Sequence, residues 1–120
     1  MHHRVLIIDD NVGFRAALRQ LLERNGFEVV AEAGDAAAGL RAAKTHSPDL
    51  AIVDVQLPGG DGFQVTEQLS RLEPEPAVIL TSSLDPGDFG ALVTSSTALG
   101  FIPKGELSAP AIAALVAPTC

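Results

Sequence analysis

Three short runs of apolar residues constrain the fold of this sequence more than any other feature. They are Val5–Ile8, Leu50–Val53 and Ala77–Leu80, and none of them contains a polar residue. Continuous apolar runs of this length are typical of strands that are buried on both faces of a parallel sheet. The segments 27–33 and 100–102 are more mixed or shorter, which suits two further strands at the edges. We therefore predict a sheet of five strands.

Segments with helical periodicity separate these strands. In the first, apolar residues recur at helical spacing from Phe14 to Leu22, and Gly26 is placed to end the helix. A fourth helix, within 85–98, is expected to depend on tertiary packing, because its glycine, serine and threonine residues are indifferent or poor helix formers. The other predicted helices are one capped by Asp35 and running to His46, one over 64–72, and one opened by Ser108 and Pro110.

The strict alternation of strands and helices also constrains the connections. Crossovers between parallel strands are right-handed, and they place helices on both faces of the sheet. The predicted fold class is α/β: a doubly wound five-stranded parallel sheet of order 2-1-3-4-5, in a flavodoxin-like three-layer sandwich. A length of 120 residues suits one domain, so we expect residues 1–120 to form a single unit.

Residues whose side chains can take part in chemistry stand at the ends of four predicted strands. Asp9 and Asp10 follow the first strand, Asp54 the third, Thr81 the fourth and Lys104 the fifth. These strands are neighbours in the predicted order, and ligands bind at the carboxyl ends of strands in such sheets, so the side chains should gather at one edge. Each alone can be a helix cap, a strand former or a surface charge, but together they predict a site.

Three carboxylates at one sheet edge repel one another, so either one keeps its proton or a cation neutralises them. Mg²⁺ suits an open cluster of this kind, because it prefers oxygen ligands and retains several waters. With the ion bound, a carboxylate can attack a phosphoryl donor and form an aspartyl phosphate. Lys104 could pair with Asp54 at rest and with a phosphoryl oxygen afterwards, and the Thr81 hydroxyl can donate to the same oxygen.

Four stretches of the sequence resemble the response-regulator receiver family, over essentially the whole chain. They are VLIIDDN at 5–11, DLAIVDVQLPGGDG at 49–62, ILTSS at 79–83 and GFIPK at 100–104. By this resemblance Asp54 accepts a phosphoryl group. Asp10, Asp54 and the Gln56 carbonyl would ligate Mg²⁺, and Asp9 would assist through bound water.

The same resemblance implies roles for the other strand ends. Thr81 and Lys104 would hold phosphoryl oxygens, and inward movement of the Thr81 hydroxyl would be coupled to rotation of Phe101. The alternative for Phe101 is an edge-strand aromatic that only packs. Gln56 and Ser83 would influence how long the phosphoryl group survives. Two positions depart from the family pattern: Gly105, not proline, follows Lys104, and Thr97 stands where a glycine commonly ends the fourth helix.

The resemblance also implies partners. A histidine kinase or histidine phosphotransferase would phosphorylate Asp54 and so remodel the surface of the fourth helix, the fifth strand and the last helix. The output would be a downstream effector protein or an output domain, and we also consider a phosphorylation-dependent homodimer. Residues 104–108 are similar to the subgroup that often precedes helix-turn-helix domains, yet none follows here, so the chain either acts alone or was cut from a longer protein. It would catalyse only its own phosphorylation and dephosphorylation, so we do not class it as an enzyme.

Composition narrows the alternatives. Fifteen acidic residues against eight basic ones give a net charge of −7, which disfavours direct binding to nucleic acid or anionic lipid. The single cysteine, Cys120, allows no internal disulfide, and no apolar run approaches the roughly 18 residues of a membrane span, so we expect a cytoplasmic protein.

Three rival functions remain. A phosphatase or phosphotransferase with an Asp nucleophile would be expected to have a second acid where Gln56 stands. A flavin or nucleotide protein is disfavoured, because no G-x-G-x-x-G follows the first strand, residues 59–62 are predicted to be a turn, and the chain has no Trp or Tyr. The third is a receiver-like docking module that is never phosphorylated.

Overall fold

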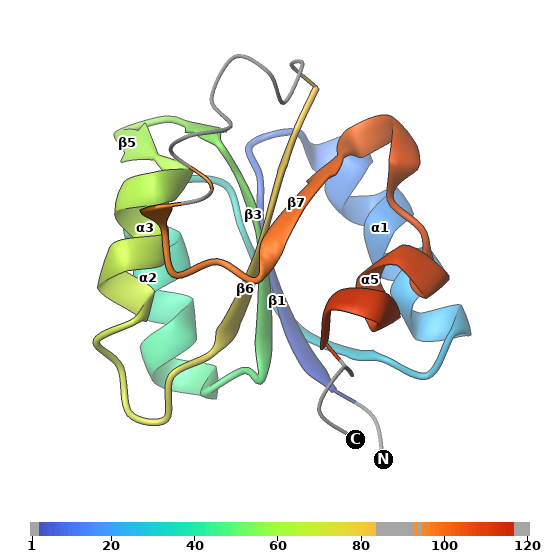
Figure 1. Ribbon diagram of the computed structural model, residues 1–120, viewed down its shortest axis with the longest axis horizontal. Helices are drawn as coiled ribbons and strands as arrows, with labels where there is room; N and C mark the ends of the chain where they lie inside the picture. The colour runs from blue at the N-terminus through green and yellow to red at the C-terminus, as the bar shows by residue number, and fades with distance from the viewer. Residues whose placement is uncertain (1–2, 84–92, 94, 117–120) are drawn as a thin grey trace.

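Five parallel strands form the central sheet of the structure, a computed structural model that describes residues 3–83, 93 and 95–116 (Figure 1). Their order is β2-β1-β3-β6-β7, which confirms the predicted order 2-1-3-4-5, since β6 and β7 are the fourth and fifth strands of that sheet along the chain. The strands are β1 (Arg4–Ile8), β2 (Glu28–Ala33), β3 (Leu50–Asp54), β6 (Ala77–Ser82) and β7 (Gly100–Pro103).

Helices cover both faces of the sheet and complete the predicted three layers. In Figure 1, α2 and α3 lie on one side of the strands, and α1 and α5 lie on the other. The predicted fourth helix, within 85–98, falls largely outside the described residues. Among the residues that are described, no helix is long and apolar enough to cross a bilayer. The helices are α1 (Val12–Arg24), α2 (Ala36–His46), α3 (Gly62–Leu69) and α5 (Ala109–Val116).

The apolar runs pack on both faces, as their composition predicts. Alternate residues of β1 belong to different cores: Leu6 and Ile8 pack on the side of α2 and α3, whereas Val5 and Ile7 pack on the side of α1 and α5. All residues of β3 are buried. The strand that ends in Asp54 is therefore held on both faces, which fixes where its last side chain lies.

Polar side chains set the start of the four helices α1, α2, α3 and α5. The side chains of Asn11, Asp35 and Asp61 each accept a hydrogen bond from the main-chain N–H three residues later, which satisfies a donor that the helix leaves free. Ser108 makes the matching contact at α5, as predicted. Gly26 follows α1 with a φ of 87°, a left-handed conformation that glycine adopts without strain.

The segment after β3 differs from the prediction. The turn predicted over 59–62 is instead the end of a small antiparallel ribbon, β4 (Gln56–Leu57) with β5 (Gly60–Asp61), followed at once by α3. Gly59, with a φ of 78°, allows the tight connection between the two short strands. Since Asp61 caps the helix, α3 begins at Gly62 rather than residue 64, and it ends at Leu69 rather than residue 72.

Candidate functional site

The acidic residues predicted at the strand ends converge in the structure. Asp9 and Asp10 follow β1, and Asp54 is the last residue of the neighbouring strand β3. One carboxylate oxygen from each of the three residues lies within 4.8 Å of the others. Asp9 and Asp54 are buried, whereas Asp10 is exposed, so the cluster opens to solvent on the Asp10 side.

Main-chain hydrogen bonds fix the two buried carboxylates. The Asn11 N–H donates to Asp9 Oδ1 at 2.8 Å, and the Gln56 N–H donates to Asp54 Oδ1 at 3.1 Å. The N–H of Asp9 itself donates to the Ala33 carbonyl at 2.9 Å. In each carboxylate the second oxygen, Oδ2, faces the Lys104 ammonium instead.

Lys104 supplies the positive charge that faces these second oxygens. It begins a short 3₁₀ turn, η2 (Lys104–Glu106), directly after β7. Its Nζ lies 2.8 Å from Asp9 Oδ2 and 3.2 Å from Asp54 Oδ2. The same nitrogen lies 4.4 Å from the centroid of the Phe14 ring, within the range of a cation–π contact. Lys104 is thus held between the end of the sheet and the first turns of α1.

Burial and charge shift the pKa values of this pair. Burial raises the pKa of Asp54, the N–H of Gln56 lowers it, and the charge of Asp9 raises it again; the attraction of Lys104 lowers it without reversing the net increase. Burial alone would lower the pKa of Lys104, but its hydrogen bond to Asp9 and the charges of Asp54 and Asp9 raise it above its ordinary value. The carboxylates thus keep Lys104 charged, while Asp54 ionises less readily than an exposed aspartate.

Thr81 brings a hydroxyl to the same sheet edge. It lies on β6 directly beside Asp54 in the parallel register, and the N–H of Val55 donates to its carbonyl at 2.9 Å. The residue is 1% exposed, and its Oγ1 has no hydrogen-bond partner among the described residues. A buried unpaired hydroxyl costs stability, and this one is free to donate to an acceptor placed next to Asp54.

The donor set fits a hard divalent cation. In the described part of the site the Lys104 ammonium pairs with Asp9 and Asp54 but not with the third carboxylate, Asp10, which leaves net negative charge at the solvent-exposed side. Oxygen ligands with room for waters are those that Mg²⁺ prefers. Gln56, the fourth predicted ligand, lies two residues beyond Asp54 with its side chain exposed. Ser83, two residues beyond Thr81, is also exposed.

Phe101, the predicted switch residue, lies on β7 beside Leu80 of β6. It is partly buried and packs against the core on the side of α2 and α3, together with Val93 and Ala98. This position is one residue from Ile102, the register partner of Thr81. Phe101 therefore packs against this core in the structure, and its rotation stays a prediction.

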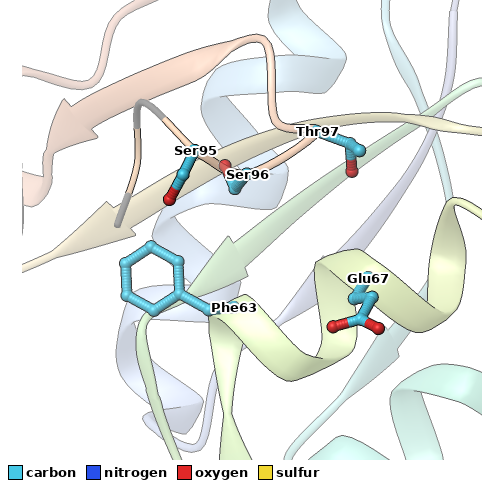
Figure 2. Close-up of a pocket in the computed structure, with 5 residues that line it drawn as sticks. All are labelled: Phe63, Glu67, Ser95, Ser96 and Thr97. Atoms are coloured by element: carbon cyan, nitrogen blue, oxygen red, sulfur yellow. The ribbon is translucent and has the colours of Figure 1, made fainter. Parts of the chain in front are cut away.

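A cavity of about 290 Å³ is lined by none of the three clustered aspartates. Figure 2 shows it between α3, which carries Phe63 and Glu67, and the segment of Ser95, Ser96 and Thr97. None of the predicted site residues is among these lining residues. The cavity is therefore separate from the cluster of Asp9, Asp54 and Lys104.

Two contributions to the site were missed at the sequence level. Phe14 fits the apolar face of the first helix, yet its ring also contacts the Lys104 ammonium. Gly62 starts α3 so close to β3 that a Cβ would lie 2.5 Å from the Asp54 carbonyl oxygen. The only sequence signals were an aromatic residue one helical turn after the acidic pair and a glycine directly after a capping aspartate.

The sequence matches one family model and several known proteins. The sequence matches the model of the response regulator receiver domain over residues 5–116. It is 37% identical over 84 residues to the chemotaxis protein CheY of Bacillus subtilis, which covers 70% of each chain. It is 34% identical over 112 residues to the DNA-binding transcriptional activator EvgA of Escherichia coli, which covers 93% of this chain and 55% of EvgA.

Solved structures agree with the sequence matches. A two-component response regulator of the LuxR family from Aurantimonas has a TM-score of 0.81 and 28% identity, covering 92% of this chain and 79% of that one. The chain spans about half the length of several curated relatives that it matches.

Proposed function

This chain belongs to the response-regulator receiver family of two-component signalling, and we propose that Asp54 accepts a phosphoryl group in a magnesium-dependent reaction. The observation that carries the proposal is the convergence of Asp9, Asp10 and Asp54 with the Lys104 ammonium at one end of the sheet. The unpaired hydroxyl of Thr81 beside Asp54 supports it. Such a constellation favours group transfer to a carboxylate, because it offers a nucleophile, counter-charges and a donor together.

In the proposed reaction, an ionised Asp54 oxygen attacks the phosphorus of the donor. The bond from phosphorus to the donor nitrogen or oxygen breaks, and the leaving group departs with the electron pair and takes up a proton. Asp10, Asp54 and the Gln56 carbonyl would hold Mg²⁺, with Asp9 assisting through bound water. The ion supplies charge that offsets the negative charge of the transferring group.

Lys104 and Thr81 would receive the new phosphoryl oxygens. Lys104 would exchange its contact with Asp54 for a charge-assisted hydrogen bond to one oxygen, and the Thr81 hydroxyl would donate to another. Satisfying the buried Thr81 hydroxyl would favour the phosphorylated state, and we propose that movement of Thr81 is coupled to a change at Phe101. The resulting change would alter the surface formed by the fourth helix, β7 and α5.

The proposed partners follow from the family. A histidine kinase or histidine phosphotransferase would supply the phosphoryl group, and a downstream effector protein or an output domain would respond. We propose residues 1–120 as one receiver unit that acts in the cytoplasm and catalyses only its own phosphorylation and dephosphorylation. A homodimer formed on phosphorylation is part of the same proposal, whereas direct nucleic-acid binding by these residues is not, given the net charge of −7.

Intact mass after incubation with acetyl phosphate and Mg²⁺ tests this function. We expect one added phosphoryl group on the native chain and none on Asp54→Ala. The matched control is Asp49→Ala, which removes an exposed aspartate just before the start of the same strand and should still be phosphorylated. No mass gain in the native chain would contradict the proposal and favour the docking module. An equal gain in Asp54→Ala would instead contradict the assignment of Asp54 as the acceptor.

A further inference from the structure

We propose that Arg15 is a positioning residue for the acidic pair, holding the peptide that joins Asp9 to Asp10 so that both carboxylates can bind the metal ion. This inference rests on the proposed function of the site. Arg15 lies on α1, one turn after the capping residue Asn11, and its side chain is 17% exposed. Its contact with the acidic pair is to the Asp9 main-chain carbonyl and not to the carboxylate of Asp9 or Asp10, so its action on the metal would be indirect.

The contacts of Arg15 join three elements at the end of the sheet. Its Nη1 donates to the main-chain carbonyl of Asp9 at 2.5 Å, and its Nε donates to Glu32 Oε1 on β2 at 3.1 Å. A Cβ at residue 34 would lie 3.3 Å from Nη1, so Gly34 leaves room for the guanidinium. The planar, forked guanidinium suits this arrangement, because it donates to two acceptors in a fixed relative orientation.

The Asp9 carbonyl is the anchor that governs Asp10. The N–H and the carboxylate of Asp9 are already held by other main-chain groups, at Ala33 and Asn11. The carbonyl, in contrast, belongs to the peptide that leads into Asp10. The exposed Asp10 carboxylate has no hydrogen-bond or ion-pair partner within the described part of the chain, so the direction of its main chain decides where it lies. Holding this peptide therefore orients the least constrained ligand of the proposed metal site.

Arg19 provides a matched control for a purely structural role. It lies one turn further along α1 and pairs with the same carboxylate, its Nε lying 3.1 Å from Glu32 Oε2. Its other hydrogen bond goes to the Val29 carbonyl at 3.2 Å, not to the acidic pair. Removing either arginine loses one contact with Glu32, but only the loss of Arg15 frees the Asp9 carbonyl.

The test is Mg²⁺ affinity, measured by titration calorimetry and by amide chemical shifts of Asn11 and Gln56 in the full chain. We expect Arg15→Met to weaken Mg²⁺ binding about tenfold, in the range found for groups that orient metal ligands. Arg19→Met should stay within about twofold of the native chain. Arg15→Lys keeps a positively charged donor group, although not the planar fork, and should recover part of the lost affinity.

The outcomes separate this inference from the function on which it rests. Thermal unfolding should show similar losses of stability in Arg15→Met and Arg19→Met, because both lose a contact with Glu32. Native affinity in Arg15→Met, an equal loss in Arg19→Met, or no recovery in Arg15→Lys would overturn the role of Arg15. Absence of Mg²⁺ binding in the native chain would instead overturn the metal site itself, and the role of Arg15 with it.

Discussion

The Nζ of Lys104 lies 3.2 Å from Oδ2 of Asp54, so the sheet edge carries an ion pair between residues 50 positions apart in sequence. The same ammonium lies closer still to Asp9, at 2.8 Å. One cation is therefore divided between two buried acids, with a third acid nearby. The resting site remains short of positive charge, which is the physical basis of the predictions that follow.

The stability of the chain should depend on the ionisation of Asp54. Burial and the charge of Asp9 raise its pKa above the ordinary value of 3.8. A carboxyl group with a raised pKa stabilises the fold below its unfolded pKa, and this contribution is lost as pH rises through the folded pKa. Asp54→Asn should therefore unfold at a higher temperature than the native chain at pH 7 without Mg²⁺. The difference should shrink as the pH is lowered toward 4, and a less stable variant at pH 7 would contradict the prediction.

Lys104→Met should change metal binding and phosphorylation in opposite directions. Mg²⁺ affinity should increase, because the ammonium no longer competes for the carboxylates. Phosphorylation by acetyl phosphate at saturating Mg²⁺ should slow about 10- to 100-fold, since a hydrogen bond to a charged group contributes about 1.5–3 kcal/mol. Lys44→Met is the control, because this exposed lysine of α2 should affect neither measurement. A parallel decrease of affinity and rate would count against the assigned role.

Thr81→Val should stabilise the unphosphorylated chain by about 1 kcal/mol in urea unfolding, because it replaces a buried hydroxyl that has no partner with a methyl group of similar size. Beryllofluoride with Mg²⁺, a mimic of the bound phosphoryl group, should then stabilise the variant less than the native chain. Thr81→Ser keeps the donor and should retain the response to the mimic. An unchanged response in Thr81→Val would show that the hydroxyl does not contact the phosphoryl group.

Gly62→Ala should destabilise the fold and disturb the site together. Its Cβ would lie 2.5 Å from the Asp54 carbonyl oxygen and 2.9 Å from the Val55 Cα, which are main-chain atoms that cannot rotate away. We expect a loss of about 1–3 kcal/mol in denaturant unfolding, as for other overpacked sites, and weaker Mg²⁺ binding. Gly105→Ala, where a Cβ meets nothing within 4 Å, should change stability by less than about 0.5 kcal/mol. Similar effects of the two substitutions would show that the close approach of α3 is not required.

The sheet could be predicted because short stretches of sequence are enough to identify its strands. The apolar runs at 5–8, 50–53 and 77–80 identify strands without reference to the rest of the chain, and their alternation with helices limits the order to few possibilities. From that order, the meeting of Asp9, Asp54, Thr81 and Lys104 followed. The chemical roles of these residues stay predictions.

Other features depend on distances that no local pattern contains. The ribbon of β4 and β5 has two residues in each strand, too few for periodicity to reveal it. The contacts of Phe14 with Lys104 and of Arg15 with Asp9 depend on how α1 crosses the sheet end. Helical spacing indicates which face a residue occupies, but not which group from another strand it will meet.

The groups of the proposed site come from the ends of four strands that are distant in sequence, because a parallel sheet places these ends at one edge. A peptide that contains Asp54 and its neighbours would lack both the acidic pair and the ammonium. Under the proposed function, the extent of phosphorylation should therefore follow the fraction of molecules that are native. Heat, or a core substitution far from Asp54, would lower the amount of phosphorylated chain in proportion to the molecules that it unfolds. This would happen although every reactive group remained chemically intact.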